Sequence, residues 1–142
     1  MNGTLVVEAL HVCDRALAWK AKSDNLFVTQ GYDQLARLLG NDLPTTRVIT
    51  QMQFGTGVTV PNAVDTTLQQ PITPTKVIAP ITYVSAYEVT LEAFLLADEA
   101  NGFTLFEAGL LTSANVLVAR VTHSGVTKTS DFIFHFTWHL RS

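Results

Sequence analysis

The sequence contains a single cysteine, Cys13, among its 142 residues. One cysteine can form neither an internal disulfide nor a CxxC metal or redox motif. A chain without disulfides suits a reducing compartment, so we expect it to fold in the cytoplasm of the producing cell. Residues 1–8 also lack the basic and long apolar segments of a secretory signal peptide.

Charged residues are scarce. They make up 15% of the chain, whereas an ordinary soluble domain has about 25%. We therefore expect neighbouring subunits to cover part of the surface. The formal net charge is −3, and lysine and arginine are scattered along the chain. This distribution argues against non-specific binding of nucleic acid, which needs a basic stripe.

Long apolar runs are missing too, although 47% of the residues are apolar. No run approaches the roughly 18 residues that a transmembrane helix requires. We expect no membrane span, and we assign the apolar residues to the core of one domain.

The motifs of common enzymes are absent as well. Gly55-Thr-Gly57 follows an expected strand, but neither the Lys-Ser/Thr of a P-loop nor the third glycine of a dinucleotide site follows it. Cys13 and His11 have no identifiable third residue to orient them as a catalytic pair. We expect no catalytic residue and no bound cofactor.

His135 and His139 lie on one face of the last expected strand. At the usual rise of a strand they are roughly 13 Å apart, too far to share one metal ion. We expect surface or interface histidines and no metal site.

The clearest secondary-structure pattern is that last strand, in which every second residue is large and apolar. Such alternation predicts a strand with one face in the core. The predicted core residues are Phe132, Phe134, Phe136, Trp138 and Leu140.

Frequent turn signals separate the other expected strands, which cover residues 4–10, 15–22, 47–54, the segment before Pro80, 83–96, 103–106 and 116–122. One helix is expected over residues 32–39, with Leu35, Leu38 and Leu39 on one face and Gly40 as a left-handed C-cap. Asp98 to Gly102 predicts a hairpin turn, the segment 107–109 a break in the sheet, and residues 55–73 a long surface loop.

These patterns predict a mainly β protein, an antiparallel β-sandwich or jelly roll with one short α-helix and an N-terminal extended arm. Residues 1–25 form the arm or the first strands, and residues 26–142 the sandwich. Glu107 is an isolated carboxylate in apolar surroundings. We expect it to be buried and paired with a backbone amide or with Arg120 in a structural role.

Three segments in order resemble small virion structural proteins of tailed bacteriophages and the N-terminal modules of phage tail-collar fibres. Residues 52–68 resemble the pattern I-x-F-G-T-G-T-x-x-P-x-x-x-D-T-x-L. Glu107-Ala-Gly-Leu-Leu resembles E-x-G-L-F, with Leu111 in place of the usual Phe. Residues 117–120, 127–129 and 136–138 resemble L-x-A-R, K-T and F-T-W. The likeness covers roughly the last two thirds of the chain.

The resemblance implies a β-sandwich used as a mortar or adaptor subunit of the virion, without enzymatic activity. Because the 142 residues include no fibre shaft, we expect a cement (decoration) protein that binds the outside of the capsid lattice. We expect it to bind neither nucleic acid nor membrane and to form a homo-oligomer, a trimer. Its partner would be the major capsid protein. The candidate contact residues are Trp19, Phe54, Gly55, Gly57, Pro61, Asp65 and Lys128, with Lys128 reaching a carboxylate on the partner.

Two alternatives stay open. The first is a tail, baseplate or neck adaptor. The second is a carbohydrate-binding module, in which exposed aromatic residues such as Trp19, Tyr83 or Tyr87 form a sugar platform.

Overall fold

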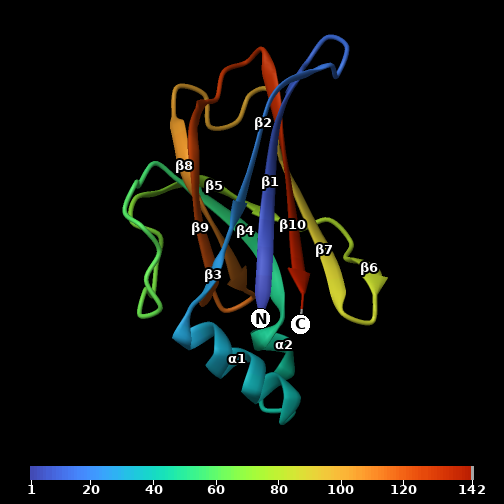
Figure 1. Ribbon diagram of the computed structural model, residues 1–142, viewed down its shortest axis with the longest axis vertical. Helices are drawn as coiled ribbons and strands as arrows, with labels where there is room; N and C mark the ends of the chain where they lie inside the picture. The colour runs from blue at the N-terminus through green and yellow to red at the C-terminus, as the bar shows by residue number, and fades with distance from the viewer. Residues whose placement is uncertain (142) are drawn as a thin grey trace.

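The computed structural model describes residues 1–141 and contains two five-stranded antiparallel sheets (Figure 1). From edge to edge, sheet A comprises β2 (Leu17–Asp24), β1 (Asn2–His11), β10 (Phe132–Arg141), β7 (Glu88–Leu95) and β6 (Thr82–Ser85). Sheet B comprises β3 (Leu26–Phe27), β9 (Leu117–Thr127), β8 (Thr104–Thr112), β4 (Ile49–Gly55) and β5 (Pro71–Val77). The expected mainly β antiparallel sandwich is confirmed.

The core lies between the two sheets, because alternate residues of their central strands point inward. Phe134, Phe136 and Trp138 of β10 are fully buried, Leu140 is buried, and Phe132 packs against the same core from a half-buried position. Burial of each such side chain contributes about 1.5–3 kcal/mol. The alternation in the last strand therefore identified the core face of sheet A.

The N-terminal segment is an integral part of sheet A and not an extended arm. Strand β1 pairs with β10 from Asn2 to His11 and with β2 on its other side. Leu5, Val7 and Ala9 are buried in the main core. The interpretation of residues 1–25 as first strands agrees with this pairing, and the arm interpretation is wrong.

Two short helices follow β3, where one was expected: α1 (Thr29–Leu39) and α2 (Pro44–Arg47). They close one end of the sandwich (Figure 1). Helix α1 buries Gly31 and Gln34, while Leu39 points to solvent. Gly40 is not left-handed, with φ −82°. Instead Asn41 takes φ 58° and the Asp42 N–H donates to the Arg37 carbonyl, so the cap lies one residue later than expected.

Three further boundaries differ from the expectation. The turn at Asn101-Gly102 does not join a hairpin, because β7 belongs to sheet A and β8 to sheet B. Strand β8 runs without a break through Glu107 and Gly109. The segment expected as one strand over residues 83–96 contains two strands, β6 and β7, joined by a tight turn.

Candidate functional site

The long connection between β4 and β5, residues 56–70, is ordered by one buried ion pair. We call it the clamped loop. Glu107 on β8 is fully buried and Arg120 on β9 is 2% exposed. The Arg120 Nε donates to Glu107 Oε1 at 3.1 Å. The expectation that Glu107 is buried and pairs with a backbone amide or with Arg120 is confirmed, and the structure shows both kinds of partner.

The Glu107 carboxylate also accepts hydrogen bonds from three backbone amides at the two ends of the clamped loop. The N–H groups of Gly57 and Gln70 donate to Oε2 at 2.8 and 2.9 Å, and that of Gln69 donates to Oε1 at 2.9 Å. One carboxylate therefore fixes both ends of the loop, and with Arg120 its two oxygens are well supplied with donors.

Arg120 connects the same pair to the middle of the clamped loop. Its Nη1 lies 3.0 Å from Asp65 Oδ2, and its Nη2 donates to the Thr59 carbonyl at 2.7 Å. Asp65 in turn accepts the Asn62 N–H at 2.8 Å. Asp65 is thus engaged within the chain and does not point outward to a partner.

Apolar and helix contacts complete the clamp. Leu68 is buried in a small second core with Val28, Leu111 and Leu117. The Thr29 N–H donates to the Ala63 carbonyl at 2.7 Å, which attaches the loop to the start of α1. The loop is consequently rigid at both ends and at its centre.

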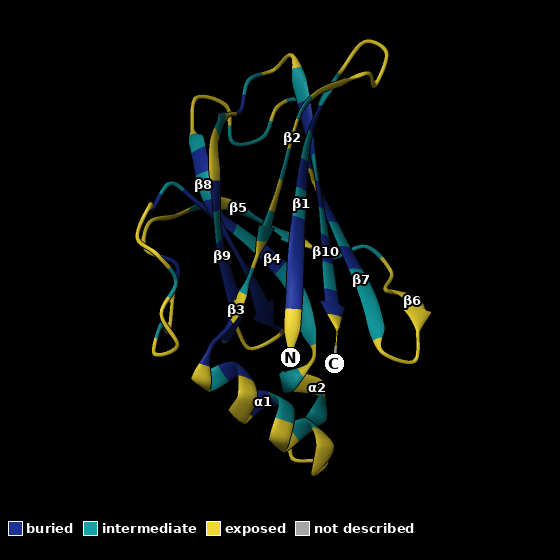
Figure 2. Cartoon of the chain, in the orientation of Figure 1, coloured by how far each residue is buried: buried dark blue, intermediate teal, exposed yellow. Residues whose placement is uncertain are grey.

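The exposed side chains of the clamped loop are uncharged, and three valines lie among threonine, asparagine and glutamine residues. Val58, Val60 and Val64 are largely exposed, and Val60 retains 77% of its accessible surface. Figure 2 shows the loop as a mostly exposed segment on one flank of the sandwich. The loop was expected from the sequence but its exposed valines were not, although three valines within seven residues of a loop are a visible signal.

Several candidate contact residues lie elsewhere than expected. Phe54 is fully buried and packs on Phe136 of the other sheet, with ring centroids 4.3 Å apart. Gly55 at the end of β4 and Gly57 in the clamped loop are both buried, and added Cβ atoms would collide with Glu107. These three residues support the clamped loop and cannot themselves contact a partner. Pro61 is half-buried on the loop.

The prediction that Lys128 contacts a carboxylate on a partner is wrong. It is fully buried, and its Nζ donates to Asn101 Oδ1 and to the Thr129 carbonyl, both at 2.9 Å. Burial lowers the pKa of Lys128, an effect that nearby Glu99 and Asp98 oppose. The lysine fixes the connection between the two sheets at Asn101-Gly102, where the Gly102 N–H donates to the Lys128 carbonyl.

The aromatic residues of the sugar-platform interpretation are separated. Trp19 is half-buried against the main core, whereas Tyr83 and Tyr87 lie on the β6–β7 hairpin and are 74% and 72% exposed.

Both tyrosines line a cavity of about 440 Å³ at the end of the sandwich, between the helices and this hairpin. We call it the end cavity. No sequence pattern pointed to it, because α1, α2 and the hairpin are distant in sequence.

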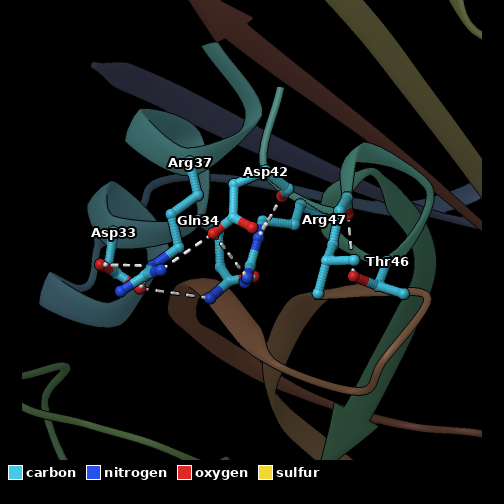
Figure 3. Close-up of polar contacts among 7 residues, drawn as sticks. Asp33, Gln34, Arg37, Asp42, Thr46 and Arg47 are labelled. Carbon is cyan, nitrogen blue, oxygen red and sulfur yellow. Dashed lines mark hydrogen bonds and ion pairs between the residues drawn. The ribbon is translucent and has the colours of Figure 1, made fainter. Parts of the chain in front are cut away.

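A polar network holds the helical wall of the end cavity (Figure 3). Arg47 at the end of α2 donates to Gln34 Oε1 of α1 at 2.9 Å and to the Asp42 carbonyl at 2.8 Å. Arg37 lies between Asp33 and Asp42, within 3.0 Å of each. These contacts join α1 to α2 and to the turn between them.

His135 and His139 lie on the outer face of sheet A, each beside carboxylates. His135 lies between Glu92, 3.0 Å from its Nε2, and Glu8, 3.5 Å from its Nδ1. His139 Nδ1 lies 3.3 Å from Glu88. The carboxylates of Glu8 and Glu92 contact opposite nitrogens of one ring, so they cannot share a metal ion with it. Within residues 1–141, no cluster of three or more His, Cys, Asp or Glu side chains could hold a metal ion.

No helix among the described residues is long and apolar enough to cross a bilayer. Comparison of the chain with protein-family models, with curated proteins and with solved structures gave no match.

Proposed function

We propose that this protein is a non-enzymatic structural subunit of a tailed-bacteriophage virion, a cement protein that binds the outside of the capsid lattice and stabilises it. The observation that carries the proposal is the meeting of the phage-like motifs in one network. Gly57 and Asp65 come from the first motif, Glu107 from the second and Arg120 from the third, and their polar groups meet around the buried pair.

The network supports a binding role because it pre-organises a surface. A loop that is already ordered loses little conformational entropy when it binds. The exposed valines offer apolar contact area without the desolvation cost of charges. A chain with 15% charged residues fits a surface that neighbouring subunits cover.

Under this proposal the partners are the major capsid protein and further copies of the chain. Many modest contacts, repeated by the symmetry of the lattice, would hold the protein in place by avidity. The protein would be made in the host cytoplasm and reside in the virion.

The test uses capsid shells of the source particle that lack the protein. Purified protein added to these shells should co-sediment with them to saturation and raise the temperature at which they rupture. Shells that bind none of the protein would contradict the cement role.

Two other positions or roles remain candidates. A tail, baseplate or neck adaptor follows from the same motif resemblance, and binding to purified tails instead of shells would favour it. A carbohydrate-binding role is favoured by the exposed rings of Tyr83 and Tyr87 beside the end cavity. Specific retention of the free protein on a glycan array, lost in Tyr83→Ala and Tyr87→Ala, would support that role.

A further inference from the structure

Two connections between the sheets lie side by side at the end of the sandwich away from the helices (Figure 1). Residues 96–103 link β7 of sheet A to β8 of sheet B, and residues 128–131 link β9 of sheet B to β10 of sheet A. The Gly102 N–H donates to the Lys128 carbonyl, and the Lys128 N–H donates to the Phe103 carbonyl, both at 2.9 Å. A covalent bond between these connections would therefore tie the two sheets together.

The side chains of Lys128 and Asn101 place an amine against a carboxamide at this junction. Lys128 Nζ lies 2.9 Å from Asn101 Oδ1. Asn101 Nδ2 donates to the Ala97 carbonyl at 2.9 Å, which orients the carboxamide. The Lys128 amine also lies 2.9 Å from the Thr129 carbonyl and 3.5 Å from that of Ala97. An uncharged amine has two N–H groups, so these two carbonyls can accept both and leave its lone pair facing Asn101.

Burial of Lys128 increases the share of its amine that is uncharged. The residue is fully buried, and burial lowers the pKa of the amine below its ordinary value, an effect that nearby Glu99 and Asp98 oppose only in part. An uncharged lysine amine is a nucleophile that attacks carbonyl carbon. The nucleophile and its target thus meet in the folded chain without any added group.

We propose that Lys128 and Asn101 form an intramolecular isopeptide bond, an amide between their two side chains. The uncharged Nζ attacks Asn101 Cγ, and a new C–N bond forms. One proton passes from Nζ to the carboxamide nitrogen, relayed by water at the exposed Asn101. The bond between Cγ and Nδ2 then breaks and releases ammonia. In total, a lysine ammonium and a carboxamide give a secondary amide and an ammonium ion, so the reaction needs no oxidant, reductant or cofactor.

The bond goes beyond the proposed function, because it concerns the chain itself and not what the chain binds. The two residues are 27 positions apart, and a cross-link that closes a loop of this kind restricts the unfolded chain and so stabilises the folded one. The link would hold sheet A to sheet B at the end opposite α1 and α2. Its test needs no capsid, so failure of the bond leaves the proposed function standing.

The mass of the intact, denatured protein tests the bond. Wild type should be lighter than its sequence by one ammonia molecule, and a proteolytic digest should contain a branched peptide that joins the segments around Asn101 and Lys128. Lys128→Met should keep its full mass, and so should Asn101→Ala, which is folded because Asn101 is exposed. Lys76→Arg is the matched control. It alters the lysine that binds Glu99 in the same connection and should lose ammonia like wild type.

Loss of ammonia has a second chemical source, which the digest distinguishes. Asn101 precedes Gly102, and an Asn-Gly pair can lose ammonia by closing a succinimide on its own backbone. An unbranched peptide that carries the loss at Asn101-Gly102, and gains one water molecule in mild alkali, would overturn the inference. Loss of ammonia that persists in Lys128→Met would overturn it too. Full mass in wild type, unchanged after the folded protein is incubated in mild alkali, would have the same consequence.

Discussion

The Arg120 Nε and the Glu107 Oε1 lie 3.1 Å apart, and both side chains are almost completely buried. Bringing two charges out of water is costly, and the cost is offset only where further hydrogen bonds satisfy the remaining donors and acceptors. Here those partners are three amides and a carbonyl of the clamped loop together with Asp65. The buried pair is therefore stable only while the loop is ordered, and the loop is ordered by the pair.

Removal of the Glu107 carboxylate should therefore destabilise the whole protein. Glu107→Ala leaves Arg120 buried without its main partner and three amides without an acceptor, so the free energy of unfolding should fall by about 3–5 kcal/mol. Denaturant titration measures the loss, and hydrogen exchange should accelerate at the amides of Gly57, Gln69 and Gln70. Asp131→Ala, at an exposed turn, is the control. A loss below about 1 kcal/mol would show that the clamp contributes little.

The clamp also leaves no room for a side chain at Gly57. An added Cβ would collide with Glu107 Oε2 and would lie 2.5 Å from Gln69 Cβ, so Gly57→Ala should displace the carboxylate and lower stability by about 1–3 kcal/mol. Gly40→Ala is the matched control. Its φ is −82° and its nearest neighbours would lie at 3.6 Å or more, so its melting temperature should stay the same or rise slightly. Equal effects of the two substitutions would contradict this steric account.

The N-terminal strands should be indispensable for folding. A chain that lacks residues 1–24 loses β1 from the interior of sheet A and should show no cooperative melt. At single-residue level, Leu5→Ala on β1 should cost about 2–5 kcal/mol, because Leu5 is fully buried. Leu17→Ala on neighbouring β2 should change stability by less than about 0.5 kcal/mol, since Leu17 is exposed. A folded, cooperative deletion variant would restore the arm interpretation.

Stability should fall on mild acidification because of His123. Burial lowers the pKa of His123 below 6.5, partly opposed by the hydrogen bond to the Ser124 carbonyl and by Glu107. The unfolded chain then binds a proton more readily than the folded one, so stability is complete above pH 6.5 and declines as the pH falls below it, by at most about 1.4 kcal/mol per pH unit. His123→Leu should flatten this slope between pH 7 and pH 5. Parallel curves for variant and wild type would refute the assignment.

The fold class could be predicted because alternation along a strand directly records which face is buried. Phe134, Phe136 and Trp138 have that signature, and they form the centre of the core. The pairing of the strands was harder to predict from the sequence. Asn101-Gly102 indicates a turn, but nothing local to it specifies that the chain passes from sheet A to sheet B there.

The candidate site was predicted only in part, because burial of polar groups depends on partners that are distant in sequence. Glu107 could be identified as buried since it interrupts apolar residues. Lys128 could not, because its acceptors come from Asn101 and from the backbone of the neighbouring turn. Gly109 was interpreted as a break in the sheet, yet it sits within β8, where Leu117 and Leu68 occupy the space that a side chain would need.

We propose a cement subunit of a phage particle, and locating the chain in that particle tests the proposal most directly. A cryo-electron microscopy map of the source virion should contain the two-sheet sandwich with its α1–α2 end, in repeated copies on the outer surface of the capsid shell. Density for the sandwich on the tail, neck or baseplate would contradict the cement role in favour of the adaptor. Purified virions without any copy of the chain would contradict the structural role altogether.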